Sequence, residues 1–310
     1  MVYQDNYMVI LNSADATIKN NTTANSNLNF SFIGLLKQDD DILRTEISIV
    51  NAQFPISFYI INALNNKIYC SYNSLFYTIT LTEGNYNAFD FITQMTTQFT
   101  ISGLSVTPTI NRNTGVLSFT STFAFQIFYS GTTCASILGL GTTDSNFGTS
   151  FTLPYPLNLL GVKKLIIRST SLAIIAYSSK TLTFTDIICT IPCDQPYFNM
   201  ISYINQNDLN RNLLKAPYID GIDIQIVDEY DNLIDFHNQD WTITIVISNT
   251  RNDKVQDNIK FNDFITSLKI NNIEKPTLPI IPPTQPIPPP KPIEEKPISE
   301  DKKILDFLQK

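Results

Sequence analysis

The chain contains one histidine, His237, in the acidic connection DEYDNLIDFHNQD that spans residues 228–240. A histidine close to carboxylates such as Asp235 and Asp240 has two of the residue types of a Ser-His-Asp arrangement, in which imidazole takes the proton of a hydroxyl nucleophile. A lone histidine among acidic loop residues is more often a solvated or capping group. The sequence therefore does not assign a catalytic role to His237.

Two sets of residues have the chemistry of metal ligands. The runs Asp39 to Asp41 and Asp228 to Asp235, the second including Glu229 and Asp231, offer carboxylate oxygens that suit a hard cation such as calcium. Neither run has the glycine and the regular spacing of a known calcium loop. Cys189 and Cys193, in CTIPC, have the spacing of half a metal site, but a second pair and further histidines are missing. We expect no metal and no cofactor, and we expect reduced thiols.

The stretch GLGTTDSNFG, residues 139–148, is glycine-rich like a phosphate-binding loop. It lacks the Gly-Lys-Ser/Thr ending, and no helix clearly follows it. A pair of carboxylates for glycoside cleavage is defined by its separation in space, and nothing in the sequence selects one. With no catalytic, cofactor-binding or metal-binding residues assigned, the sequence predicts a protein that is not an enzyme.

The elements that surround these residues are mostly strands. Between residues 220 and 248, apolar and polar residues alternate, which predicts two strands of a sheet with one face on a core. The inward face would be formed by Ile222, Ile224, Ile226, Trp241, Ile243, Ile245 and Ile247. Similar patterns predict strands at 7–12, 27–33, 44–52, 67–72, 76–82, 105–110, 116–129, 163–170 and 181–189.

One helix and one hairpin interrupt the strands. In GNYNAFDFITQMTTQF the residues Phe89, Ile92, Met95 and Phe99 would share one helix face, with Asn87 as the N-cap. Residues 107–119 predict a hairpin whose turn is marked by Asn113 and Gly115. Strands joined by connections long enough to cross between sheets favour an all-β jelly roll over a simple meander.

Composition restricts the partners. The 310 residues are 43% hydrophobic and only 16% charged, with a net charge of −7. Direct binding to nucleic acid is not expected, because that affinity comes from Lys and Arg at phosphates. No apolar run reaches 18 residues, and the N-terminus lacks a signal-peptide pattern, so the sequence gives no sign of export or membrane anchoring.

The C-terminal part differs from the rest, since ten of the seventeen prolines fall between Pro276 and Pro297. Residues 276–310 are expected to form a proline-rich arm with polyproline II character that ends in a short terminal helix. Residues 251–275 are expected to include an amphipathic helix. The alternative is that the prolines form a motif for an aromatic groove. The partner of this tail is unknown.

Taken in order, several segments are similar to a known family: ILNSADA, SNLNFSF, AQFPISFYIINALNN, ITLTEGNYNAFDFITQM, ASILGLG, PYPLNLLGVKKLIIRSTSL and GIDIQIVDEYDNLIDFHNQDWTITIVI. The succession, over about residues 5–248, resembles the penton (minor capsid, vertex) proteins of virophages and polinton-like viruses, in the double-jelly-roll virus lineage. The proline-rich tail is a departure from this family.

The resemblance implies an all-β fold: a single eight-stranded jelly roll, or two-sheet sandwich, with a β-rich insertion containing one helix. In this chain the proline-rich C-terminal arm, which the prolines themselves predict, is added to that fold. The roll would comprise 1–60 and 153–250, and the outward-standing insertion 61–152. The implied function is that of a structural virion protein, a homopentamer at icosahedral vertices that contacts neighbouring trimers of the major capsid protein. It would be assembled in an infected host cell, with the insertion available to a host receptor.

One alternative remains from another class of protein. An all-β carbohydrate- or receptor-binding module, of adhesin or lectin type on a proline-rich stalk, would use some of the 14 tyrosines and 20 phenylalanines to line a sugar site. Such a protein would be secreted or displayed, and the missing signal pattern disfavours it. An enzyme is the least favoured class, for want of a nucleophile and base.

Overall fold

The computed structural model describes residues 2–21, 23–36, 42–172, 176–178, 183–206, 211–214 and 219–252. All of them belong to one compact unit, Met1–Asn258, and the other unit, Ile259–Lys310, lies outside the described residues. The predicted amphipathic segment 251–275 therefore lies outside them except for its first two residues, which end a strand. The proline-rich arm at 276–310 lies outside them entirely.

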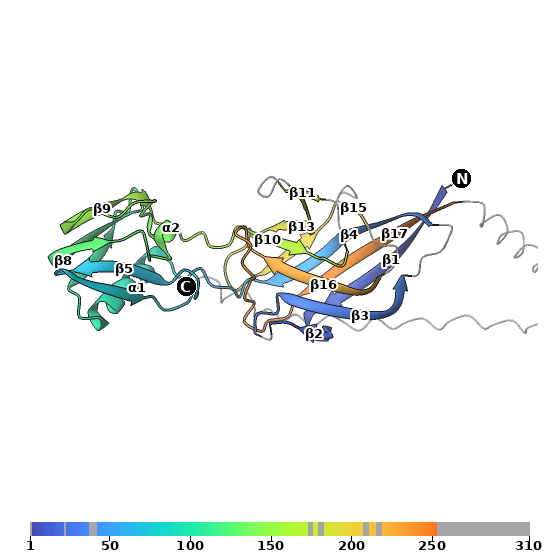
Figure 1. Ribbon diagram of the computed structural model, residues 1–310, viewed down its shortest axis with the longest axis horizontal. Helices are drawn as coiled ribbons and strands as arrows, with labels where there is room; N and C mark the ends of the chain where they lie inside the picture. Colours follow the sequence, from blue (N-terminus) through green and yellow to red (C-terminus); the bar gives the residue numbers. More distant parts are fainter. Residues whose placement is uncertain are drawn as a thin grey trace, which may run out of the picture. The chain divides into compact units, whose positions relative to one another are not determined.

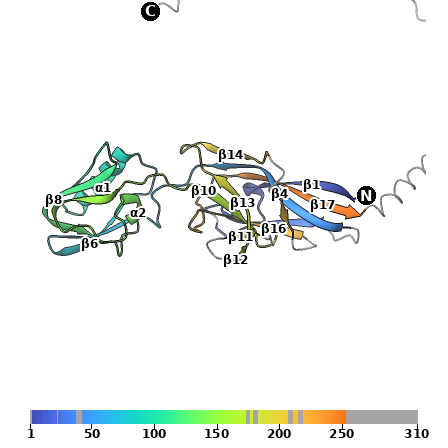
Figure 2. The ribbon, with the colours of Figure 1, turned by 90° about the horizontal axis from the view of Figure 1, so that it is seen from above.

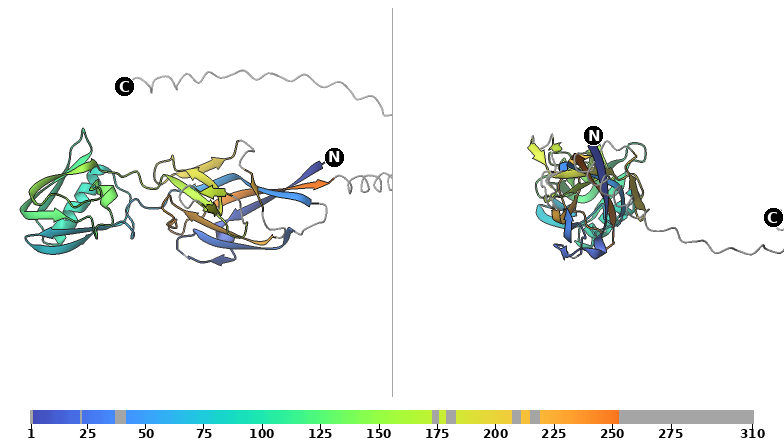
Figure 3. Two further views of the ribbon diagram at one scale, coloured as in Figure 1. Left: turned by 45° about the horizontal axis from the view of Figure 1, so that its top comes forward. Right: turned by 90° about the vertical axis from the view of Figure 1, so that its right-hand side faces the viewer.

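The first sheet of the structure brings together strands from both ends of the described chain (Figure 1). In spatial order its strands are β1 (Val2–Asn12), β17 (Thr242–Asn252), β4 (Ile42–Pro55) and β14 (Met200–Ile204), with β15 (Asn212–Leu213) also pairing with β4. All of these pairs are antiparallel. The long strands β4 and β17 can be followed side by side in the left view of Figure 3.

The second sheet contains the strands that lie between those of the first in the sequence. Its spatial order is β13 (Ile187–Pro192), β10 (Lys164–Arg168), β16 (Ile219–Val227), β3 (Asn27–Leu36) and β2 (Ile18–Lys19). The eight principal strands, in chain order, are β1, β3, β4, β10, β13, β14, β16 and β17. Numbered 1 to 8 in that order, they give the sheet orders 1-8-3-6 and 5-4-7-2. These are the two four-stranded sheets of a jelly roll. The structure thus confirms the predicted all-β jelly-roll fold.

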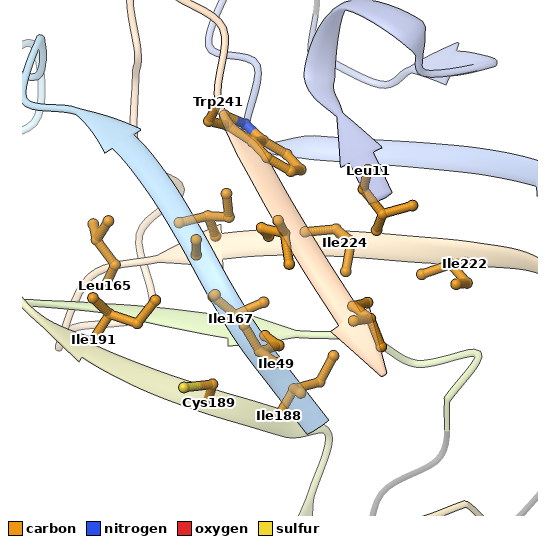
Figure 4. Packing of buried hydrophobic residues seen from close by; sticks show 14 of the residues in the cluster. Leu11, Ile49, Leu165, Ile167, Ile188, Cys189, Ile191, Ile222, Ile224 and Trp241 are labelled. Carbon is orange, nitrogen blue, oxygen red and sulfur yellow. The ribbon is translucent and has the colours of Figure 1, made fainter. Parts of the chain in front are cut away.

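The inward faces of the two sheets form one hydrophobic cluster (Figure 4). The seven residues predicted to face inward from the 220–248 stretch are all buried. Trp241 lies immediately before β17 and is 1% exposed, and its indole Nε1 donates a hydrogen bond of 2.6 Å to the carbonyl oxygen of Asn25. Its ring packs on Phe30 and Phe54, one from each sheet. This residue therefore ties the two sheets together.

The chain between β4 and β10 forms an insertion with its own sheet and a second hydrophobic cluster. Its elements are β5 (Lys67–Tyr72), β6 (Leu75–Thr80), α1 (Ala88–Ile101), β7 (Val106–Ile110), β8 (Val116–Ile127), α2 (Ala135–Leu138) and β9 (Gly148–Pro156). Helices α1 and α2 lie together with β6 and β8 in Figure 2. A two-stranded sheet, β11 (Ala176–Ser178) with β12 (Thr183–Thr185), follows β10.

The insertion differs from the sequence prediction in several details. Residues 153–156 lie in β9, which pairs with β8, rather than in the roll, because Leu153 packs in the cluster of the insertion. The one-turn helix α2 accompanies the single helix that was predicted. In the described ranges, no helix is long and apolar enough to span a membrane.

Helix α1 begins as predicted, and its buried face matches the predicted one at Met95 and Phe99 but not at Phe89. The Asn87 side chain accepts hydrogen bonds from the backbone N–H groups of Phe89 and Asp90, which confirms it as the N-cap. The buried residues are Phe91, Met95 and Phe99, whereas Phe89 is 55% exposed. The predicted stripe was wrong at Phe89 because the side chain of this first-turn residue points away from the sheet. Its ring lies below the guanidinium of Arg112 instead.

The hairpin between β7 and β8 forms as predicted, but another residue holds its turn. The side chain of Asn111 accepts hydrogen bonds from the backbone N–H groups of Asn113 and Thr114. Gly115 adopts φ 71°, a left-handed conformation that glycine adopts without a steric cost. Asn113 was predicted to mark this turn, and it contributes its backbone N–H.

The substitution Trp241→Ala tests the role of this residue in the roll. Removing a buried indole leaves a cavity and an unpaired carbonyl at Asn25, so we expect the free energy of unfolding to fall by about 3–5 kcal/mol. The measurement is urea denaturation followed by circular dichroism. The control is Tyr230→Ala, at a side chain that is 70% exposed, which should stay within about 0.5 kcal/mol of wild type. Equal losses in both variants would contradict the assignment.

Candidate functional site

His237 lies in the connection between β16 and β17, in a left-handed conformation with φ 49°. Its backbone N–H donates a 2.8 Å hydrogen bond to Oδ1 of Asp235, and its ring packs on Tyr59 with 4.1 Å between ring centroids. The hydroxyl of Ser57 donates to the Phe236 carbonyl oxygen at 2.7 Å. Within the described chain, no hydroxyl or thiol hydrogen-bonds to the imidazole, so the arrangement of a nucleophile with a base is not formed there.

The carboxylates of the same connection have separate protein partners. Asp228 accepts hydrogen bonds from the backbone N–H groups of Tyr230 and Asn232 and so holds a turn. Asp231 forms an ion pair with Arg168 at 2.6 Å, and Glu229 accepts from the backbone N–H of Lys163. Among the described residues, no three His, Cys, Asp or Glu side chains are grouped to hold a metal ion. Asp39, Asp40 and Asp41 lie outside them.

Cys189 and Cys193 are free thiols in the structure, as are Cys70 and Cys134. Burial and, to a smaller extent, the negative charges of Glu229 and Asp194 together raise the pKa of Cys193 to about 12. Burial also raises the pKa of Cys189, against a hydrogen bond with Tyr203 that lowers it. Because the thiolate is the form that binds metals, these environments disfavour the half metal site suggested by the CTIPC spacing.

The glycine-rich stretch 139–148 joins α2 to β9. Gly139 ends α2 in a left-handed conformation with φ 79°, and β9 follows at Gly148. Asp144 accepts a 2.8 Å hydrogen bond from the backbone N–H of Tyr129, which fixes the loop to the end of β8. Since a strand rather than a helix follows, the stretch does not present a helix N-terminus to a phosphate.

One polar network escaped sequence reasoning. The carboxylate of Asp223, on the solvent face of β16, accepts hydrogen bonds from the side chain of Ser169, from the side chain and backbone of Thr170 and from the backbone of Ser171, at 2.6–2.9 Å. Burial alone would raise the pKa of Asp223, but the hydrogen bonds from Ser171 and Thr170 outweigh it and lower the pKa to about 2. No spacing in the sequence links residues about 50 positions apart. The network fixes the chain that leaves β10.

A second feature that sequence reasoning missed is the solvent face of the first sheet. Its two outer strands expose apolar side chains: on β1, Met8 is 67% and Ile10 is 68% exposed, and on β14, Met200 is 50% and Ile204 is 62% exposed. The pattern MVIL at 8–11 breaks the alternation of apolar and polar residues, and this break was the signal that could have been read. The second sheet instead places charged residues outward, among them Lys164, Arg168 and Asp223.

Comparisons with known proteins give likenesses in structure but not in sequence. No family model matches the chain, and no curated protein matches it in sequence. Among solved structures, the chain is similar to the crystal structure of the selenomethionine-labelled mavirus penton protein. The TM-score is 0.44 at 9% sequence identity, and the match covers 81% of this chain and 99% of that chain.

The substitution Asp223→Asn tests the polar network. A carboxylate whose pKa is depressed in the folded state stabilises the fold above its ordinary pKa, and this contribution is lost as pH falls toward 2. We expect the variant to be less stable than wild type at pH 6, with a difference that shrinks between pH 4 and pH 2. Urea midpoints across this range measure it.

The control for this experiment is Asp194→Asn, at an exposed carboxylate outside the network. Its stability difference from wild type should stay small between pH 6 and pH 4. A difference for Asp223→Asn that stays constant from pH 6 to pH 2 would show that its charge does not stabilise the loop.

Proposed function

We propose that this chain is a structural virion protein, the penton or minor capsid subunit that closes into a homopentamer at the vertices of an icosahedral capsid. The observation that carries the proposal is a pair of unprotected apolar edges on the first sheet of the jelly roll. The sequence resemblance to penton proteins agrees with it. In the part of the chain described, no nucleophile and base lie together, so we propose no enzymatic activity.

The first edge is β1. A strand at the edge of a sheet has unpaired backbone N–H and C=O groups, and proteins that stay monomeric protect such edges with charges, prolines or short strands. Strand β1 has 11 residues, no proline and one charged residue, Asp5, which is paired with Arg251 at 2.7 Å. Next to this backbone lie the exposed side chains of Met8 and Ile10. Such an edge favours contact with another chain.

The second edge, β14, lies at the opposite side of the same sheet. Its sequence MISYI contains no charged residue and no proline, and Met200 and Ile204 are exposed. Phe198, two residues before the strand, is 85% exposed. Two different apolar patches on opposite edges suit a heterologous contact, in which β1 of one subunit meets β14 of the next. A repeated heterologous contact generates a ring when the rotation closes.

The surface between the two edges supports the same assembly. On the outward face of the central strands β17 and β4, Thr242, Thr244, Asn51 and Gln53 are uncharged, and the charged residues Arg44 and Glu46 form an ion pair with each other at 2.9 Å. Interfaces are depleted of charge at their centres, because burying an unpaired charge costs far more than burying a hydrogen-bonded amide or hydroxyl. The uncharged part of this face can thus be covered by neighbouring subunits at low desolvation cost.

The remaining partners follow from the position of a vertex protein. In this proposal, trimers of a larger major capsid protein surround the pentamer, and the protein is located in the virion after assembly in an infected host cell. The insertion, residues 61–152 as a domain of its own, is the part available to a host receptor. The proline-rich arm has no assigned partner.

Native mass spectrometry of the purified chain with two interface variants tests the proposal. Wild type should give a species of about 175 kDa, five times the 35.0 kDa chain. Ile10→Asp and Ile204→Asp each place a charge in one half of the heterologous contact. Either variant alone should therefore be monomeric. In an equimolar mixture, the intact β14 of the Ile10→Asp chain can still pair with the intact β1 of the Ile204→Asp chain. The mixture should therefore form dimers of about 70 kDa, twice the 35.0 kDa chain, and nothing larger.

The control is Ile101→Asp, at an apolar side chain that is 73% exposed at the end of α1 in the insertion, and it should leave the pentamer intact. If the Ile204→Asp variant still forms rings of the wild-type mass, β14 takes no part in the contact between subunits. A wild-type chain that stays at 35 kDa at all concentrations would contradict the proposed self-assembly.

A further inference from the structure

The insertion contains an open groove of about 640 Å³ where the end of β8, helix α2 and the start of the 139–148 loop meet. Two tyrosines line it together with small residues: Tyr129 is 44% exposed and Tyr155 is 59% exposed. The volume is within the range of roughly 300–1,000 Å³ that is usual for sites that bind small ligands. Exposed aromatic side chains beside a hollow of this size are typical of a recognition surface.

Two glycines of the groove lining let the loop pack closely against Tyr155 of β9. Gly139 and Gly141 both have left-handed backbones, with φ 79° and 81°. A side chain at Gly139 would collide with the carbonyl oxygen of Tyr155, and one at Gly141 would lie 2.9 Å from the ring of Tyr155. Because neither position carries a side chain, the ring of Tyr155 can lie against the backbone of Gly141 at the groove.

The two tyrosines are held by their backbones while their rings remain exposed. The backbone N–H of Tyr155 donates to the carbonyl oxygen of Gly139 at 3.1 Å. The backbone N–H of Tyr129 donates to Oδ1 of Asp144 at 2.8 Å. Binding therefore does not have to order the backbone that carries either ring, which favours binding.

The chemistry of the groove selects a neutral ligand rich in hydroxyl groups. No charged side chain lines it, so it has no counter-charge for a phosphate, a sulfate, an acidic sugar or a cation. Ser130, Ser136 and Thr142 are exposed lining residues, and within the described chain their hydroxyls make no hydrogen bond. Tyrosine rings contact an apolar face, and free hydroxyls and backbone groups pair with polar ones. A neutral hexose presents both kinds of group.

We propose that this groove binds a neutral glycan, with a sugar ring stacked on Tyr155 or Tyr129 and its hydroxyl groups bonded to the serine and threonine hydroxyls. The inference adds a binding activity to the proposed capsid role and does not depend on it. A protein that formed no ring would still carry this groove.

A second groove in the insertion provides an internal comparison. It has a volume of about 620 Å³, lies between α1 and strands β7 and β8, and includes Thr100, Thr107 and Thr120 in its lining. It offers hydroxyls but no aromatic side chain. Without a ring on which a sugar can stack, it is not expected to bind a glycan.

The experiment uses the full chain on an array of neutral, sialylated and sulfated glycans, followed by saturation-transfer NMR. The NMR probes are the methyl glycosides of glucose, galactose, mannose and N-acetylglucosamine at millimolar concentration. We expect binding to at least one neutral glycan and to the matching glycoside. Tyr155→Ala and Tyr129→Ala should each weaken it about tenfold or more.

The controls are Phe147→Ala, at an exposed aromatic side chain outside the lining of this groove, and Thr120→Ala in the second groove, and both should bind like wild type. Circular dichroism melts and native masses of all variants should match wild type, which separates loss of the site from loss of the fold or of the ring. The proposal is overturned if no neutral glycan binds, if acidic glycans are preferred, or if both tyrosine variants bind unchanged.

Discussion

The whole roll depends on the packing of the two inward sheet faces. Every second side chain of each strand points inward, and these side chains meet around Trp241. A shift of one residue in any of these strands would turn its apolar set toward water, so the register is fixed by the core. In β16 and β17 this means that Ile224 and Ile245 point inward while Asp223 and Thr244 point outward. The positions of the Asp223 network, the His237 connection and both edges of the first sheet follow from that register.

Because the core of the roll consists of hydrophobic side chains, contacts with other molecules have to be made at its surface. A sandwich that is not closed into a barrel must leave two edges on each sheet, and the described chain has no charge or proline that blocks β14 and only a paired Asp5 on β1. The insertion contributes a surface of another kind, the groove beside the exposed rings of Tyr129 and Tyr155. The proposed assembly contacts thus lie on the jelly roll and the proposed ligand site on the insertion, and each of these parts has its own hydrophobic cluster.

The sequence predicted the parts of this structure that depend on local pattern. The alternation at 220–248 predicted two strands and their inward faces correctly, and Asn87 was recognised as a helix cap because that signal lies within three residues. Features that join distant positions could not be predicted, such as the hydrogen bonds from Ser169 and Thr170 to Asp223. The break in the alternation at 8–11 indicates apolar side chains on both faces of β1, but the sequence does not say that this strand is the edge of its sheet.

The measurement that tests the account most directly is electron cryomicroscopy of the assembled protein, in which both the symmetry and the contacts are visible. The account predicts a fivefold ring in which β1 of each subunit, with Met8 and Ile10, meets β14 of its neighbour, with Met200 and Ile204. A ring whose subunits touch through the charged outer face of the second sheet, or particles that contain only single chains, would contradict it.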